Sequence, residues 1–172
     1  MQSFDNRGKR EYNQFVASAT IGGSMEHLMR FVSLTGRYAR VYREYEFKQL
    51  GLNAFEHFYI LNICRNPGLS QDQIARRLYL NKSTVTRQLA SLEEKGFVLR
   101  VVDENDKRVM RVYPTEKAIE IRPKIFELIR KWNEYVLNDF SEEEKTLLFP
   151  MLARIMERAG QYAEALVEEE EN

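Results

Sequence analysis

The segment 68–115 is the part of this sequence that most narrows the possible folds. Ser70 and Gln73 form a capping box, because the serine oxygen can accept a free backbone N–H while the glutamine reaches back, and we expect a helix over 70–80. A second helix should follow over 81–96, since an asparagine stands at its start and a glycine at its end. Two short helices joined by a tight turn predict a helix-turn-helix.

Two stretches rich in β-branched and aromatic residues follow, over 97–102 and 109–113, and a polar turn separates them. They predict a hairpin with charged residues near its tip, before a new helix begins at Thr115. This order is a winged helix-turn-helix, a layout typical of proteins that bind duplex DNA. Each charged residue alone would also suit the solvated face of an ordinary helical domain, but the whole order of elements favours the DNA-binding layout.

The second helix of the pair carries the residues best suited to a DNA contact. Val85, Leu89 and Leu92 recur at helical spacing and should face the core. The residues left outward or half outward are short hydroxyls and two cations: Lys82, Ser83, Thr84, Thr86, Arg87 and Ser91. Hydroxyls bond phosphates or base edges, arginine can bind guanine through two hydrogen bonds, and a helix start favours an anion.

The hairpin tip adds a further candidate contact. Arg108 is placed to reach a neighbouring minor groove, whose narrow A·T stretches attract arginine. Asp106 stands two residues earlier and could hold that guanidinium in a fixed pose.

Four motifs in combination resemble the MarR family of bacterial transcription regulators: NKSTVTR (81–87), LEEKGFV (92–98), DKR (106–108) and YPTEK (113–117). The resemblance covers roughly residues 26–166. It implies a homodimer, a recognition helix in the major groove and an Asp-x-Arg wing in the minor groove. Carried over to this chain, it implies these base-contacting, phosphate-contacting and wing residues: Ser83, Thr84, Thr86, Arg87, Asp106 and Arg108.

Two features depart from that family pattern. The wing tip is acidic as well as basic, with Asp103, Glu104 and Asp106, which should soften its DNA contact. Residues 1–24 have no counterpart, and they form an arm that was either added in cloning or is a native extension. A third alternative is an arm that touches DNA through its basic cluster of Arg7, Lys9 and Arg10.

The composition suits one compact domain with arms, since the chain has 172 residues of which 44% are apolar. It contains no run of about 18 apolar residues that would predict a transmembrane helix, and no apolar segment of a secretory signal near its start. One cysteine excludes an internal disulfide framework and fits a reducing cytoplasm. We therefore expect a cytoplasmic protein, associated with the nucleoid through DNA.

The formal net charge is zero, which by itself argues against DNA binding, but the charge is unevenly distributed. Residues 70–117 hold 10 Lys and Arg against 7 Asp and Glu, a balance of +3. Residues 118–172 hold 7 against 13, a balance of −6. A DNA-facing segment joined to a separate assembly region would give this asymmetry, and a symmetric dimer would double the positive balance on one face.

The remaining sequence predicts long helices around this segment, in a mainly α fold. The first runs over 26–49 with a stripe at helical spacing: Leu28, Phe31, Thr35, Tyr38, Tyr42 and Tyr45. A second, from a capping-type start at Asn53, ends near Arg65 before Pro67, and Leu69 can add a short strand to the hairpin. A third runs over 115–138 with this buried face: Ile121, Ile125, Leu128, Trp132, Tyr135 and Val136. The last helix begins with a capping box at Ser141. Pro123 should bend the third helix, and Pro150 should bend the last one.

Three long apolar stripes exceed what so small a domain can bury, and a partner subunit is the simplest solution, although packing within one chain remains an alternative. We therefore expect a helical dimerisation region over 25–50 and 115–167, a winged helix-turn-helix over 51–114, an arm over 1–24 and an acidic tail over 168–172. Two recognition helices related by symmetry would lie about 34 Å apart, one turn of DNA, and would bind the two half-sites of a pseudo-palindromic operator.

No enzyme signature is present, since the sequence lacks a glycine-rich phosphate loop, a nucleophile elbow and a Cys/His cluster at zinc spacing. We expect no cofactor and no metal. His27 and His57 are interpreted as partly exposed structural residues, and Cys64 as a buried core thiol rather than a redox sensor.

Members of the family often bind small aromatic acids, so the resemblance implies a possible small aromatic or phenolic effector. Residues of the first two helices could line its cleft: Arg37, Tyr38, Tyr42, Tyr45, His57 and Tyr59. An equally good interpretation places the tyrosines in a dimer core or on the surface.

The leading hypothesis is a sequence-specific, DNA-binding transcription regulator, more often a repressor than an activator, that acts as a homodimer. The alternative is a winged-helix module that has lost DNA binding and docks another protein, which the zero net charge and the acidic tail support.

Overall fold

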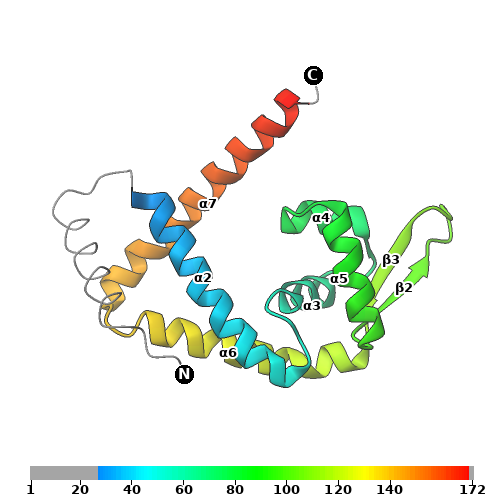
Figure 1. Cartoon of the computed structure of the whole chain (residues 1–172), viewed down its shortest axis with the longest axis horizontal. Coiled ribbons are helices and arrows are strands. Elements are labelled where there is room, and N and C mark those ends of the chain that lie inside the picture. Colours follow the sequence, from blue (N-terminus) through cyan, green and yellow to red (C-terminus); the bar gives the residue numbers. More distant parts are fainter. Residues whose placement is uncertain (1–26, 171–172) are drawn as a thin grey trace. The chain divides into compact units, whose positions relative to one another are not determined.

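The computed structural model describes residues 27–170 of the chain (Figure 1). The expected arm over 1–24 and the last two residues of the expected tail lie outside the described residues. The chain divides into two compact units, one up to Phe126 and one from Glu127. It is mostly helical with a small antiparallel sheet, which confirms the predicted fold class.

The first unit begins with helix α2 (Leu28–Glu46), whose end tightens into a 3-10 turn, η2 (Phe47–Leu50). Gly51 ends the turn with a φ of 71°, a left-handed conformation that glycine adopts without steric cost. Phe47 is buried, but α2 itself has no buried residue within the described chain. The stripe expected along this helix is therefore not part of the core of the single chain.

Helix α3 (Glu56–Arg65) begins as the sequence predicts. The Asn53 Oδ1 atom accepts the N–H groups of Phe55 and Glu56, and the Glu56 carboxylate accepts the Asn53 N–H at 2.7 Å. These reciprocal bonds satisfy N–H groups that a helix start leaves without partners. The helix supplies much of the core, with Tyr59, Ile60 and Ile63 buried.

The helix-turn-helix consists of α4 (Gln71–Leu78) and α5 (Lys82–Glu94), each with the predicted cap. The Ser70 side chain and Gln73 make both bonds of a capping box. Helix α4 ends at Leu78, two residues earlier than expected, because Tyr79 turns to a left-handed φ of 52°. The two helices pack through buried apolar side chains: Ile74, Ala75, Val85, Leu89 and Leu92.

The wing is an antiparallel sheet in the order β1-β3-β2. Strands β2 (Val98–Val102) and β3 (Met110–Pro114) form the predicted hairpin, each beginning one residue later than expected. Strand β1 (Leu69–Ser70) is the expected short strand, and Leu69 pairs with Val112 of β3.

Helix α6 (Glu116–Val136) spans the boundary between the units and continues through Pro123. The Thr115 Oγ1 atom accepts the Ala118 N–H at 3.3 Å, which confirms the predicted start. Of its expected buried face, Ile125 and Leu128 are buried. The expectation was wrong for Tyr135 and Val136 in the last turn of the helix, which are 82% and 40% exposed in the single chain because helical periodicity does not show whether the chain covers an apolar side.

The second unit also contains helix α7 (Glu142–Glu170), which continues through Pro150. The Ser141 hydroxyl accepts the Glu144 N–H, and the Glu144 carboxylate accepts the Ser141 N–H, so the predicted capping box is present. Residues 168–170, expected in an acidic tail, lie in the last turn of the helix. Large apolar side chains of α7 are exposed in the single chain: Leu147, Phe149, Met151, Leu152, Ile155, Met156, Tyr162 and Leu166.

None of the helices in the described part of the chain is long and apolar enough to cross a membrane.

Candidate nucleic-acid interface

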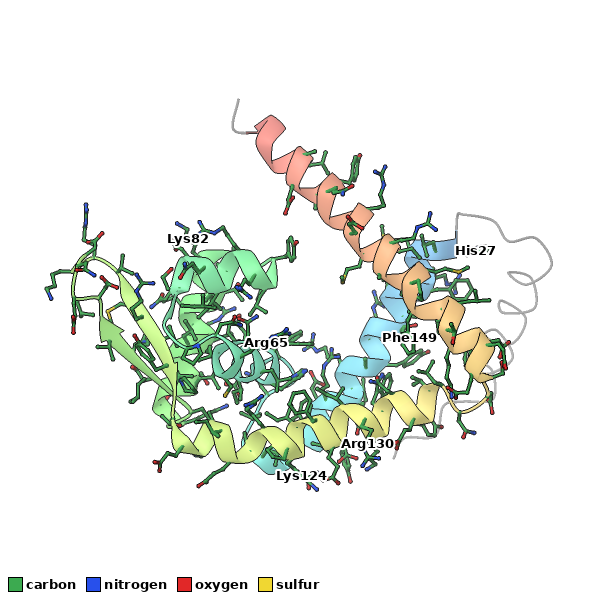
Figure 2. All side chains as sticks on the ribbon, turned by 180° about the vertical axis from the view of Figure 1, so that it is seen from behind. His27, Arg65, Lys82, Lys124, Arg130 and Phe149 are labelled. Atoms are coloured by element: carbon green, nitrogen blue, oxygen red, sulfur yellow. The ribbon has the colours of Figure 1, made fainter. Side chains whose placement is uncertain are left out.

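Helix α5 lies with one side in the core and the other toward solvent. Val85, Leu89 and Leu92 are fully buried and fix the rotation of the helix. The side chains expected to contact DNA are exposed or half-buried as a result: Lys82, Ser83, Thr84, Thr86 and Arg87. Lys82 points outward from the start of the helix (Figure 2). The structure thus brings the predicted set together on one surface.

The first turn of α5 is organised by its cap. The Asn81 Oδ1 atom accepts the Thr84 N–H at 2.8 Å and the Ser83 hydroxyl at 3.0 Å. The remaining N–H groups of a first helical turn have no partner within the helix, and they favour an anion such as a phosphate. The Ser83 hydroxyl donates a hydrogen bond to Asn81, and its oxygen remains able to accept a bond from a base amino group.

Two residues of this surface are already bonded to helix α4. The Lys82 Nζ atom lies 3.0 Å from the Asp72 carboxylate. The Thr86 hydroxyl lies 3.1 Å from the Gln71 side-chain oxygen and 2.9 Å from the Lys82 carbonyl oxygen. These contacts join the beginnings of the two helices, and nothing in the local sequence pattern predicts them.

Lys82 and Arg87 are the two cations of this surface, and Arg87 makes no ion pair with any residue that the structure describes. Burial raises the pKa of Tyr59, and the charge of Arg87 partly offsets that rise. An unpaired, exposed guanidinium is available for the bidentate guanine contact that the sequence suggests.

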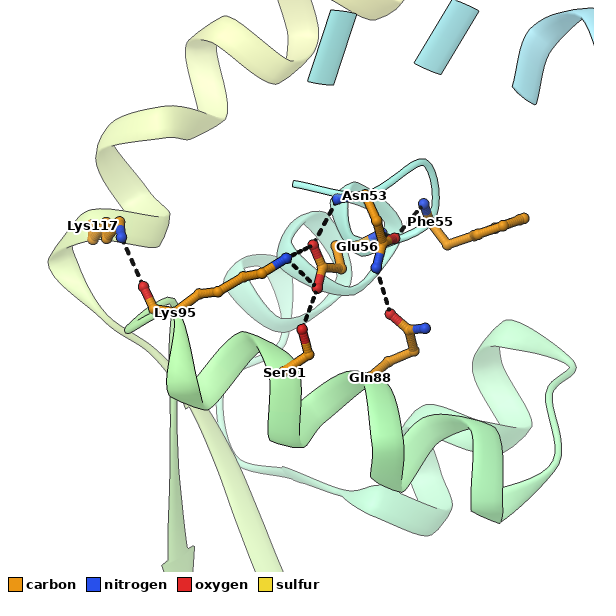
Figure 3. A network of polar contacts seen from close by, with 7 residues as sticks. All are labelled: Asn53, Phe55, Glu56, Gln88, Ser91, Lys95 and Lys117. Carbon is orange, nitrogen blue, oxygen red and sulfur yellow. Dashed lines mark hydrogen bonds and ion pairs between the residues drawn. The ribbon is translucent and has the colours of Figure 1, made fainter. Parts of the chain in front are cut away.

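The other end of α5 is anchored to α3 by a buried carboxylate (Figure 3). Glu56 is fully buried, and its two oxygens accept bonds from Lys95 at 2.7 and 2.9 Å. One oxygen also accepts the Ser91 hydroxyl at 2.8 Å, and the other the Asn53 N–H. All the described partners of this charge are good donors, as a buried carboxylate requires. Ser91, expected to lie outward or half outward, is half-buried and bonded to Glu56.

The same end of α5 is bonded to the start of α6. The Lys117 Nζ atom donates to the Lys95 carbonyl oxygen at 2.7 Å and lies 4.3 Å from the centre of the Phe97 ring. The Thr115 hydroxyl contacts the Gly96 carbonyl oxygen at 2.8 Å. A cation at the last carbonyls of a helix also interacts favourably with its dipole.

The wing holds its arginine as predicted. Arg108 is 92% exposed, and its Nε atom lies 3.2 Å from the Asp106 Oδ1 atom. The same oxygen accepts the Arg108 backbone N–H at 3.0 Å. The carboxylate therefore restricts the guanidinium while most of that group faces solvent, which suits insertion into a groove.

Asp103 has a different role from the one expected at an acidic wing tip. Its carboxylate accepts the Arg111 guanidinium and the N–H groups of Asn105 and Asp106. These bonds, chiefly the one from Arg111, lower the pKa of Asp103 to about 2. The charge is paired on the protein itself, so that Asp103 orders the turn and repels DNA less than the composition of the tip suggests.

The six residues expected to line an effector cleft differ in burial. Tyr38 and Tyr45 are exposed, whereas His57 and Tyr59 are buried. The interpretation of His57 as partly exposed was wrong: it packs against Phe47 and Phe58, and burial lowers its pKa to about 3. A groove of about 470 Å³ beside α2 includes Arg40, Lys48, Phe55 and Lys95 but none of the six.

Cys64, expected to be a buried core thiol, is only half-buried, and this burial raises the pKa of its thiol. The thiolate is the reactive form, so this environment makes the residue less reactive. Within residues 27–170, no group of three or more His, Cys, Asp and Glu side chains is placed to hold a metal ion.

Comparisons with known proteins agree with the winged-helix fold. The model of the MarR family matches residues 52–110. The uncharacterized HTH-type transcriptional regulator YybA of Bacillus subtilis is 29% identical over 145 residues, which are 80% of this chain and 94% of that protein. The HTH-type transcriptional regulator PecS of Dickeya dadantii is 34% identical over 113 residues, 63% of this chain and 68% of that protein. A putative MarR family regulator from Listeria monocytogenes, solved with a 26mer DNA, has a TM-score of 0.71 at 27% identity and covers 76% of this chain and 87% of its own.

Proposed function

Since this chain belongs to the MarR family of transcriptional regulators, we propose that it is a repressor that binds a pseudo-palindromic DNA operator as a homodimer. The observation that carries the proposal is the surface of α5. Its buried side fixes the helix, and its exposed first turns present Lys82, Ser83, Thr86 and the unpaired Arg87. This combination of hydroxyls, two cations and a helix start is what a major groove can bind.

The wing supports the same function. Arg108, held by Asp106 and otherwise exposed, is the residue we assign to a minor groove beside the site that α5 reads. The pairing of Asp103 with Arg111 compensates one negative charge that would oppose the contact. Base edges read by α5 would supply sequence preference, and phosphate contacts would supply most of the salt-dependent affinity.

The dimer is proposed from the apolar surface that one chain leaves exposed. Helix α2 has no buried residue, and the apolar side chains of α7 that include Phe149, Met151 and Leu152 are exposed. So much apolar surface is typical of a protein–protein interface. In a symmetric dimer, two copies of α5 would bind half-sites about 34 Å apart, one turn of DNA.

Repression follows from occupancy, because a dimer bound over a promoter excludes other proteins from the same DNA. Such a regulator acts in the cytoplasm, on the nucleoid. Release by a small aromatic effector has little support in the described residues, since His57 and Tyr59 are buried while Tyr38 and Tyr45 are exposed on another helix.

Genome-fragment enrichment tests the proposal. The purified full chain is incubated with sheared genomic DNA at about 0.15 M salt, and the retained fragments are sequenced. We expect enrichment of one pseudo-palindromic sequence that Arg87→Ala changes at one symmetric position and Arg108→Ala weakens. Arg130→Ala serves as the matched control, because Arg130 is exposed on α6 and pairs with Glu134. A folded protein that retains no fragment above background would instead favour the protein-docking alternative.

A further inference from the structure

The beginnings of α4 and α5 are connected by two exposed polar contacts, between Asp72 and Lys82 and between Gln71 and Thr86. Lys82 and Thr86 are four residues apart, so they lie on the same side of α5. Their partners are consecutive residues at the start of α4. The two contacts therefore form one clasp over the part of α5 that is proposed to enter the major groove.

This clasp contributes little to folding stability. The Lys82 and Asp72 side chains are 76% and 52% exposed, and exposed ion pairs contribute little because water screens them. Both bonds nevertheless occupy donors of residues that the proposed function assigns to DNA. Because these contacts restrain side chains assigned to DNA and contribute little to folding, their effect should be on the contact of those side chains with DNA.

We propose that Asp72, assisted by Gln71, is a positioning residue that makes DNA binding more sequence-specific, an inference that rests on the proposed function. A free lysine at a helix start can bind any phosphate, whatever the sequence. Bonded to Asp72, the ammonium group has its charge compensated and one of its three N–H donors fixed. The other two N–H groups are then directed to acceptors on a base edge, such as the O6 and N7 atoms of guanine.

The position of Asp72 beside the wing supports this role. A groove of about 200 Å³ lies between the start of α4 and the wing, and its lining includes Asp72, Gln71 and Arg108. Asp72 therefore shares a surface with the arginine assigned to the minor groove. A phosphate that approached Lys82 from this side would meet the Asp72 carboxylate, whose charge repels it. A base edge carries no net charge and meets no such repulsion.

The test compares two duplexes, the enriched operator and a scrambled duplex of the same composition, by fluorescence anisotropy at several salt concentrations. The wild type should discriminate between them. Asp72→Asn should lower that discrimination about five- to tenfold, chiefly by binding the scrambled duplex more tightly, with a salt slope steeper by about 1 because Lys82 gains a phosphate. Its melting temperature should stay within about 3 °C of the wild type.

Two further variants separate positioning from a general change in charge. Glu120→Gln removes one negative charge from an exposed position on α6 and should leave the discrimination unchanged. In a Lys82→Met background, Asp72→Asn should have no further effect on discrimination, because the two residues act as a unit. Equal tightening of both duplexes by Asp72→Asn would overturn the inference while leaving DNA binding intact. A wild type that binds no duplex would overturn the proposed function and the inference together.

Discussion

Replacing Lys95 with methionine should destabilise the protein far more than the loss of an ordinary lysine, because it leaves the Glu56 carboxylate buried without its cation. Breaking a buried ion pair by removing one partner costs about 3–5 kcal/mol. Two observations reduce that figure here. The Lys95 side chain is 34% exposed, so water can enter the vacated space, and Glu56 keeps the bonds from Ser91 and the Asn53 N–H. We expect a loss of about 2–3 kcal/mol in the free energy of unfolding.

The reverse change should be milder. In Glu56→Gln, the Lys95 ammonium can turn to solvent, and the glutamine oxygen still accepts one of the bonds. We expect a loss of about 1 kcal/mol. The double variant Glu56→Gln, Lys95→Met should be more stable than Lys95→Met alone, because no buried charge remains.

Urea unfolding followed by circular dichroism measures these differences, at one fixed protein concentration because dimerisation shifts apparent stability. A loss of about 2–3 kcal/mol should lower the midpoint by about 1 M urea with the slope unchanged. Arg130→Met is the matched control, since the pair of Arg130 with Glu134 is exposed and should contribute less than about 0.5 kcal/mol. If Lys95→Met costs no more than Arg130→Met, then the carboxylate does not depend on its cation and the reasoning fails.

Three further changes are expected. Tyr79→Gly should raise the free energy of unfolding by about 0.5–1 kcal/mol, measured by urea unfolding, because Tyr79 is 73% exposed and holds a left-handed backbone that glycine adopts without strain; a loss of stability would contradict this. Asp103 has its pKa lowered to about 2, so its bonds should hold the wing turn at every pH above the pKa of an unfolded aspartate and should be lost only as the pH falls toward 2. The amide NMR shift of Asn105 should follow this loss. A change in that shift centred near pH 4 would refute the prediction. His57 has its pKa lowered to about 3, so the unfolded chain binds a proton at this residue before the folded chain does, and the free energy of unfolding should fall as the pH drops below about 6.5. Unfolding measured at several pH values should show that His57→Phe lacks this pH-dependent loss of stability.

The beginnings of the helices were predictable because a helix cap is a local signal. Ser70, Asn81, Thr115 and Ser141 bond to backbone groups three residues away, and each bond is present as expected. The end of α4 was less predictable, since Tyr79 adopts a backbone conformation that sequence reasoning reserves for glycine or asparagine. The capping signal predicts where α4 begins, whereas the left-handed backbone of Tyr79, which ends the helix, has no such local signal.

The partners of charged side chains were not predictable, because they come from distant positions. Glu56 is recognisable from sequence as part of a helix start, but its bonds to Ser91 and Lys95 join residues 35 and 39 positions apart. The stripe of α2 and the exposed end of α6 show the same limit from the other direction. Their periodicity identifies an apolar side, but in the single chain α2 contributes no buried residue and Tyr135 and Val136 of α6 are exposed.

Helix α5 is therefore divided into two parts with different roles. Its last turn is tied to α3 through the fully buried Glu56 carboxylate, and it also bonds to Lys117 of α6 through an exposed contact. Near its start, Val85 is buried in the core, but the polar contacts to Asp72 and Gln71 are exposed and contribute little to the fold. Substitutions of the buried contacts in the last turn should thus act mainly on folding, and substitutions of the exposed Lys82 and Thr86 mainly on DNA recognition. This division allows the recognition surface to change its preferred sequence without loss of the anchor that holds the helix in place.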